Sequence, residues 1–188
     1  MDLIELIIDD EEGVGVEAIS LVENPAIEEN FIALKNNKVE FKTIDEEKRI
    51  VVGLALVPEK QIYRRDGDTE YYVFFSKQTV RKAAELYLKN HNNNNATLEH
   101  ESKAEGVSVV ESWIVEDVKK DKTALYGLNA VKGAWAVVMR ITNDEIWKDV
   151  KKGTYKGLSI EGYFADKLEN KPNNEDLKMI EELKKLLS

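Results

Sequence analysis

Two residues in this sequence combine a side-chain type suited to nucleophilic catalysis with an unusual sequence setting. His100 lies in the segment Thr-Leu-Glu-His-Glu (97–101), and Ser159 lies between two glycines in Gly-Leu-Ser-Ile-Glu-Gly (157–162). A serine hydroxyl is a weak nucleophile at neutral pH until a neighbouring base such as histidine removes its proton. The flanking glycines would let another backbone or a peptide approach this segment closely. Each residue also has a simpler interpretation, as a hydrogen-bonded structural histidine and as an ordinary strand serine.

Other kinds of chemistry find less support. His91, the second histidine, stands beside four asparagines and is expected in a solvated loop. Glu99 and Glu101 flank His100, but adjacent strand residues point to opposite faces and make poor joint metal ligands. A Gly-x-Ser-x-Gly turn is absent, because Glu161 stands where the second glycine would be. The sequence also lacks a phosphate-binding loop, a dinucleotide fingerprint and a His-Glu-x-x-His motif, so we expect neither a cofactor nor a metal.

The composition limits the classes of partner. The chain has 188 residues, of which 43% are hydrophobic, enough for one domain with a sizeable core. Its net charge of -9 argues against binding to nucleic acid or to an anionic membrane surface, both of which use clustered Lys and Arg. The lack of cysteine excludes a thiol nucleophile and disulfides. We expect no signal peptide, because the first ten residues lack a basic region, and no membrane span.

Both candidate residues are expected on strands. Apolar segments that are rich in Val, Leu and aromatic residues, either continuous or alternating with polar residues, predict strands. His100 lies in one such segment, on the same side of the strand as Leu98, and Ser159 lies in the last. The predicted strands are 3–8, 39–44, 49–57, 70–75, 96–101, 107–115, 125–128, 134–141 and 157–164.

Two helices are inserted between these strands. Ser76 is expected to cap the first, and Thr142 with Glu145 matches a capping box for the second. Strand–helix–strand units are few, which favours an antiparallel sheet over a parallel one. The predicted fold class is therefore α+β, with a mainly antiparallel β-barrel core.

The chain divides into three predicted parts. Residues 1–38 form an N-terminal strand and a partly extended arm, residues 39–166 form the barrel domain, and residues 167–188 form a polar linker and an amphipathic C-terminal helix. This helix either folds back onto the domain or docks on another molecule. Its apolar face comprises Leu177, Ile180, Leu183, Leu186 and Leu187.

Three segments, taken together, resemble a known family. They are Ile-Ser-Leu-Val-Glu-Asn-Pro-Ala (19–26), Leu-Glu-His-Glu (98–101) followed by Val-Glu-Ser-Trp (110–113), and Lys-Gly-Leu-Ser-Ile-Glu-Gly (156–162). The chain resembles the prohead proteases of phages over about residues 16–165, and their XkdF-type branch in particular. The resemblance implies a barrel like that of the herpesvirus assemblins. It also implies a serine endopeptidase that cuts scaffold and major capsid precursor proteins before the genome enters the head.

The resemblance assigns Ser159 to the nucleophile and His100 to the general base. Such a pair needs a third group that holds the imidazole in the correct tautomer and stabilises its charged form. Glu111 is the first choice, because it lies on the next predicted strand after His100. Asp166, Glu161 or a water molecule are the alternatives, since the second histidine that assemblins place after the serine is absent here.

This interpretation places the protein in the host cytoplasm, inside the assembling prohead. Its expected partners are the scaffold and capsid precursors, with a possible homodimer. One alternative is a catalytically silent virion or scaffold-associated protein on the same fold. Another is a small α+β binding module in which both candidate residues are structural. An active-serine probe separates the enzyme from both.

Overall fold

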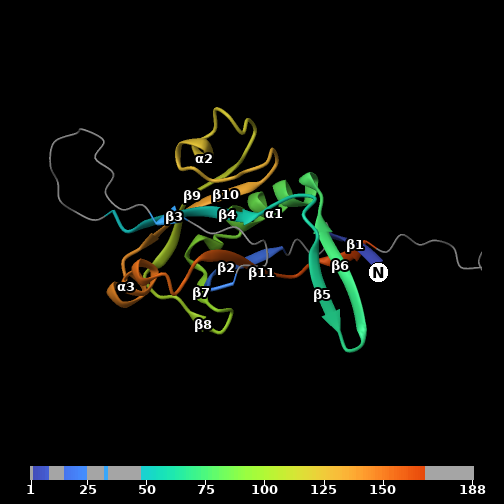
Figure 1. Ribbon diagram of the computed structural model, residues 1–188, viewed down its shortest axis with the longest axis horizontal. Coiled ribbons are helices and arrows are strands. Elements are labelled where there is room, and N and C mark those ends of the chain that lie inside the picture. The colour runs from blue at the N-terminus through green and yellow to red at the C-terminus, as the bar shows by residue number, and fades with distance from the viewer. Residues whose placement is uncertain (1, 9–14, 25–31, 34–47, 168–188) are drawn as a thin grey trace, which may run out of the picture.

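The computed structural model describes residues 2–8, 15–24, 32–33 and 48–167 (Figure 1). The strand expected at 39–44 and the amphipathic C-terminal helix lie outside these described residues.

The described strands form three four-stranded sheets. The first has the order β12-β1-β6-β5, with bounds Ala165–Lys167, Asp2–Ile7, Thr69–Phe75 and Ile62–Asp66. The second has the order β3-β4-β10-β9, with bounds Ile32–Ala33, Ile50–Leu56, Trp135–Ile141 and Val107–Ile114. The third has the order β11-β2-β7-β8, with bounds Gly157–Gly162, Val16–Val22, Ala96–Leu98 and Ser102–Lys103.

The sheets confirm part of the predicted fold class. Helices and mainly antiparallel sheets make the fold α+β, and the two parallel neighbours are β1 with β6 and β2 with β7. The closed barrel is not found, because each sheet of the described residues ends in two edge strands. Closure would need the first and last strands of one continuous sheet to pair. Here the chain instead distributes its strands among three short sheets.

Helix α1 (Lys77–Lys89) begins where the sequence predicts. Ser76 is its N-cap, and its side-chain oxygen accepts a hydrogen bond from the backbone N–H of Thr79. The buried face of the helix includes Tyr87, whose ring packs edge-on against that of Trp135 with 5.3 Å between centroids. This packing joins the helix to the second sheet, and the buried Leu21 and Leu158 of the third sheet belong to the same core.

Helix α3 (Asp144–Lys152) begins one residue later than its capping box predicts. Asn143 is the N-cap, because its side-chain oxygen accepts hydrogen bonds from the N–H groups of Glu145 and Ile146. The Thr142 hydroxyl donates instead to the carbonyl of Gly106, at 3.0 Å. Thr142 thus anchors the chain next to β9 rather than capping the helix.

A third helix replaces a predicted extended segment. The sequence predicts a short strand at 125–128, but the chain forms the one-turn helix α2 (Lys122–Leu125), which ends at the first residue of this segment and is followed by a turn. Asp121 explains the difference: its carboxylate accepts hydrogen bonds from the Thr123 N–H and from the Trp113 indole, both at 2.9 Å. A short 3-10 helix, η1 (Asn92–Asn94), follows α1. None of the helices in the described part of the chain has the length and apolarity needed to cross a membrane.

Candidate active site

Ser159 lies on β11, an edge strand of the third sheet. Leu158 and Ile160 point to the core side of this strand, where Leu158 is almost fully buried. Ser159 and Glu161 therefore share the other face, because successive strand residues alternate. Directly opposite Ser159 on β2 is Ser20, which is fully buried.

Gly162 allows the end of β11 to cross close to the chain before β2. A Cβ atom at this position would lie 2.0 Å from the carbonyl oxygen of Gly15. The N–H of Tyr163 donates to that same carbonyl, at 3.1 Å. The close backbone approach expected from the glycine at the end of this segment is therefore present, and the neighbour is the chain itself.

His100 lies in the turn between β7 and β8, not inside a strand as its sequence indicates. Glu99 and His100 have φ angles of 50° and 63°, left-handed values that cost a non-glycine residue roughly 1–2 kcal/mol. Three hydrogen bonds hold the turn: His100 N–H donates to Ser20 Oγ at 3.1 Å, Glu99 N–H to the Leu21 carbonyl at 3.1 Å, and Glu23 N–H to Glu99 Oε1 at 2.7 Å. Backbone strain that the surrounding structure maintains is typical of functional sites.

The His100 ring contacts the carboxylate of Glu161. Its Nδ1 lies 3.2 Å from Glu161 Oε1, and the hydroxyl of Thr97 donates a hydrogen bond to the same oxygen. A carboxylate at Nδ1 favours a proton on that nitrogen, which leaves the lone pair of Nε2 free to act as a base. The His100 side chain is 41% exposed, so that its ring is accessible to a substrate.

Ser159 and His100 come to the same face of the third sheet without bonding directly. Ser20 links them, because it stands opposite Ser159 and its hydroxyl accepts the backbone N–H of His100. Within the described residues, no hydrogen bond joins the two candidate side chains. Catalytic hydrogen bonds are often long until substrate is bound, so this geometry is compatible with a serine and its base.

The other two candidate residues lie on strands of other sheets than the third. Glu111 lies on β9 of the second sheet, where it forms an ion pair with Lys122. Asp166 lies on β12 of the first sheet. The carboxylate that contacts the His100 ring in the described part of the chain is that of Glu161, which the sequence offered only as an alternative.

Ser20 and Thr97 are site residues that the sequence did not single out. Both lie within strands between apolar neighbours. Ser20 falls in the segment 19–26 that carries part of the resemblance, and Thr97 in the segment that holds His100, but neither was assigned a role. They become neighbours because β2 and β7 pair in parallel with Ser20 opposite Thr97. Only this pairing, joining segments far apart in the chain, reveals the row of hydroxyl groups from Ser159 through Ser20 to Thr97.

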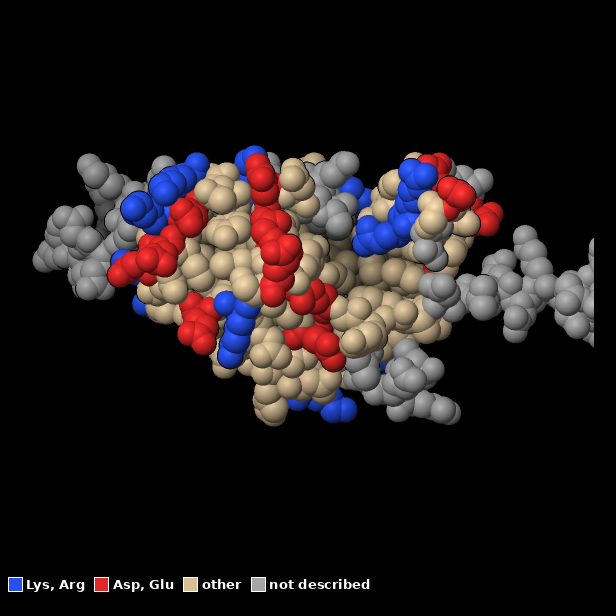
Figure 2. Space-filling view, turned by 90° about the horizontal axis from the view of Figure 1, so that it is seen from below, with Lys and Arg blue, Asp and Glu red and all other residues tan. Residues whose placement is uncertain are grey.

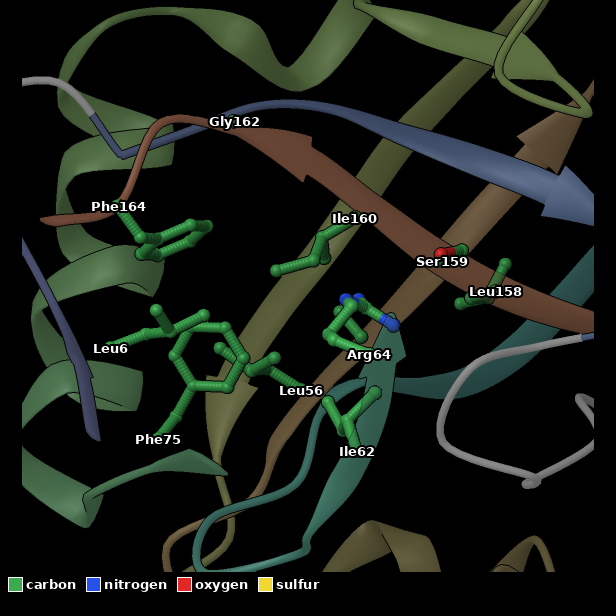
Figure 3. Close-up of a pocket in the computed structure, with 11 residues that line it drawn as sticks. Leu6, Leu56, Ile62, Arg64, Phe75, Leu158, Ser159, Ile160, Gly162 and Phe164 are labelled. Carbon is green, nitrogen blue, oxygen red and sulfur yellow. The ribbon is translucent and has the colours of Figure 1, made fainter. Parts of the chain in front are cut away.

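A cleft of about 270 Å³ opens beside Ser159 (Figure 3). Strands β11 and β5 both contribute to its lining, and Leu6, Phe75 and Phe164 gather at one end. Arg64 is the charged side chain in the lining and extends from β5 toward β11 and Ser159. The lining therefore has an apolar end and an end to which Ser159 and Arg64 both contribute.

The remaining ionisable groups add little further chemistry. In the described ranges, no three His, Asp or Glu side chains are grouped as metal ligands would be. Tyr155 lies near the His100 turn, where burial and then the carboxylates of Asp149 and Glu99 raise the pKa of its phenol. Tyr155 is therefore protonated at neutral pH and is no candidate for a general base.

Comparison with known proteins identifies the family. A family model described as "Putative phage serine protease XkdF" matches residues 38–169. The chain belongs to this family. The match covers most of the chain, including Ser159 and His100, and confirms the resemblance seen in the sequence; Ser20 lies before it. No curated protein and no solved structure matches the chain.

Proposed function

We propose that this member of the XkdF family is a serine endopeptidase with Ser159 as nucleophile and His100 as general base. The contact between His100 Nδ1 and Glu161 carries the proposal, because it orients the ring as a catalytic base requires. The position of Ser159 on the same face, at the edge of a cleft, supports it further.

The proposed reaction is acyl transfer through a covalent intermediate. Ser159 Oγ attacks the carbonyl carbon of the scissile peptide bond while its proton passes to Nε2 of His100. The C–N bond then breaks, and the imidazolium returns the proton to the leaving amine. Water attacks the acyl-serine with His100 again as base, which releases the acid product and regenerates the serine.

Glu161 takes the role of third group in this proposal, in place of Glu111. Glu161 contacts His100 directly. Glu111 instead lies on β9 of the second sheet and forms an ion pair with Lys122. The Thr97 hydroxyl donates a hydrogen bond to the same Glu161 oxygen, Oε1, and so helps to hold the carboxylate in place. Glu161 would hold the proton on Nδ1 and stabilise the imidazolium, without itself exchanging a proton with substrate.

The proposed substrates are the scaffold and major capsid precursor proteins, cut inside the assembling prohead in the host cytoplasm during head maturation. The phage origin of the family supports this assignment.

An active-serine probe tests the catalytic proposal directly. The purified full chain is treated with a fluorophosphonate, and the modified residue is located by mass spectrometry. We expect labelling on Ser159, loss of labelling in Ser159→Ala, and retained labelling in the control Ser108→Ala, which alters a half-buried strand serine of β9. Labelling of Ser159→Ala to the wild-type extent would refute the nucleophile assignment.

Cleavage of a precursor tests the biological part of the proposal. The protein is co-expressed with the scaffold and major capsid precursors from the same phage, and their masses are followed. Wild type should shorten at least one of them, and Ser159→Ala should shorten none. If neither labelling nor cleavage occurs, the catalytically silent virion or scaffold-associated protein becomes the better interpretation.

A further inference from the structure

The cleft beside Ser159 lies between the edges of two sheets. In the described residues, β11 pairs only with β2, and β5 pairs only with β6, so each strand has a second edge without a hydrogen-bonded strand partner. Such edges present N–H and C=O groups that can pair with an added strand. The space-filling view shows a hollow between two lobes of this surface, with Lys or Arg side chains on one rim (Figure 2).

Strand alternation directs two β5 side chains into the cleft. Ile62 and Arg64 both line it, whereas their neighbours Tyr63 and Arg65 point to the other face of β5. The Tyr63 hydroxyl is bonded to Glu70, and Arg65 Nε donates to the Gly67 carbonyl. Arg64 and Arg65 are thus adjacent cations on opposite faces, only one of which lines the cleft.

Arg64 has donors to spare. Its guanidinium donates one hydrogen bond, to the Tyr63 carbonyl at 3.2 Å, and no carboxylate among the described residues pairs with it. A guanidinium has five N–H donors in a planar fork that matches a carboxylate. A cationic group with unused donors therefore lines the same cleft as the proposed nucleophile.

The far end of the cleft suits a large apolar side chain. Phe75 and Phe164 meet edge-on with 4.8 Å between ring centroids, and Leu6 and Leu56 complete the wall (Figure 3). The volume of about 270 Å³ falls below the roughly 300–1,000 Å³ of sites for small-molecule ligands. It is better matched to one or two side chains of a peptide.

We propose that this cleft is the substrate-binding groove, and that it takes an extended peptide as an added strand between β11 and β5. The peptide carries an acidic side chain near the scissile bond, paired with Arg64, and a large apolar side chain in the pocket formed by Phe75 and Phe164. Main-chain pairing along the edges supplies affinity and the two side chains supply selectivity. This inference rests on the proposed protease function.

A randomised decapeptide library tests the groove in two ways. Peptides retained by immobilised Ser159→Ala protein are sequenced, so that binding is measured without catalysis, and sites cut by the wild-type chain are mapped by mass spectrometry. Both experiments are repeated with Arg64→Glu and with Arg65→Glu as a matched control on the opposite face of β5. We expect retained and cleaved peptides to be enriched at least tenfold in those that combine Asp or Glu with a large apolar residue.

The outcomes separate the groove from the protease. Arg64→Glu should abolish the acidic preference or reverse it toward Lys and Arg, while Arg65→Glu should leave it unchanged. Retention with this pattern but no cleavage by wild type would support the groove and contradict the protease. Cleavage without acidic preference, equal effects of the two substitutions, or the absence of any retained or cleaved peptide would each overturn the groove.

Discussion

The contact between Gly162 and Gly15 makes the stability of the third sheet sensitive to a single methyl group. In Gly162→Ala the new Cβ would stand 2.0 Å from the Gly15 carbonyl oxygen and 2.8 Å from the Val16 Cα. Real Cβ atoms keep at least 3.0 Å from such atoms, so the two backbones must separate by about 1 Å. Both partners are backbone, and no side chain can rotate away to make room.

The cost follows from two changes. Overpacking of this kind costs about 1–3 kcal/mol. Separation by about 1 Å would also stretch the bond from Tyr163 N–H to the Gly15 carbonyl, now 3.1 Å, beyond hydrogen-bonding distance and remove about another 1 kcal/mol. We therefore expect Gly162→Ala to lower the free energy of unfolding by about 2–4 kcal/mol.

Urea unfolding, followed by tryptophan fluorescence, measures this loss. Gly67→Ala is the control. Gly67 has a φ of 57°, but apart from its two chain neighbours no residue has an atom within 4 Å of the place that the new methyl group would take. The cost of this substitution is therefore conformational, about 1–2 kcal/mol. A free energy of unfolding for Gly162→Ala within about 0.5 kcal/mol of wild type would refute the steric reasoning.

Three further predictions test other parts of the structure. Glu161→Gln should lower kcat by about 10²–10⁴-fold on a cleaved substrate, whereas Glu111→Gln should change kcat less than twofold. A larger loss for Glu111→Gln than for Glu161→Gln would assign the orientation of the His100 ring to Glu111. Asp121→Ala should cost about 1–2 kcal/mol in chemical unfolding, because its carboxylate caps α2 and binds the Trp113 indole. Burial opposes ionisation of Asp121, but hydrogen bonds from these donors outweigh it and hold its pKa below the ordinary 3.8. The stabilisation by the ionised carboxylate should therefore be present above pH 3.8 and lost as the pH falls through the lowered pKa. An equal cost of Asp121→Ala at pH 2 and pH 7 would contradict this pH dependence. Tyr87→Phe should leave the free energy of unfolding unchanged or raise it by about 1 kcal/mol, because the buried hydroxyl has no hydrogen-bond partner among the described residues. Thermal unfolding measures this change, and a loss above about 1 kcal/mol would show that the hydroxyl does have a partner.

Features set by local sequence could be predicted, and features set by distant pairing could not. The helix start at Ser76 and the strand that carries Ser159 depend on a few neighbouring residues and were confirmed. The conformation of His100 depends on bonds from Ser20, Leu21 and Glu23, which lie in another strand and its continuation. Strand periodicity alone therefore placed His100 in a strand rather than in a strained turn.

The choice between Glu111 and Glu161 shows the same limit. Nearness in the sequence favoured Glu111, whose strand follows His100 along the chain. The two strands nevertheless join different sheets, and β11 reaches the His100 turn through β2. Which carboxylate meets the ring thus depends on sheet order, a non-local property, and so does the expected barrel closure that the described strands lack.

The row of hydroxyls across the third sheet also has a consequence for biosynthesis. Ser20 emerges early from the ribosome, His100 follows 80 positions later, and Ser159 comes only with β11, near the end of the described chain. Contacts of such long sequence separation form slowly and only after all their segments are available. A nascent or truncated chain that lacks β11 has neither the proposed nucleophile nor the carboxylate that contacts the proposed base. Translation itself therefore delays the assembly of a competent site until nearly all of the described chain has been made.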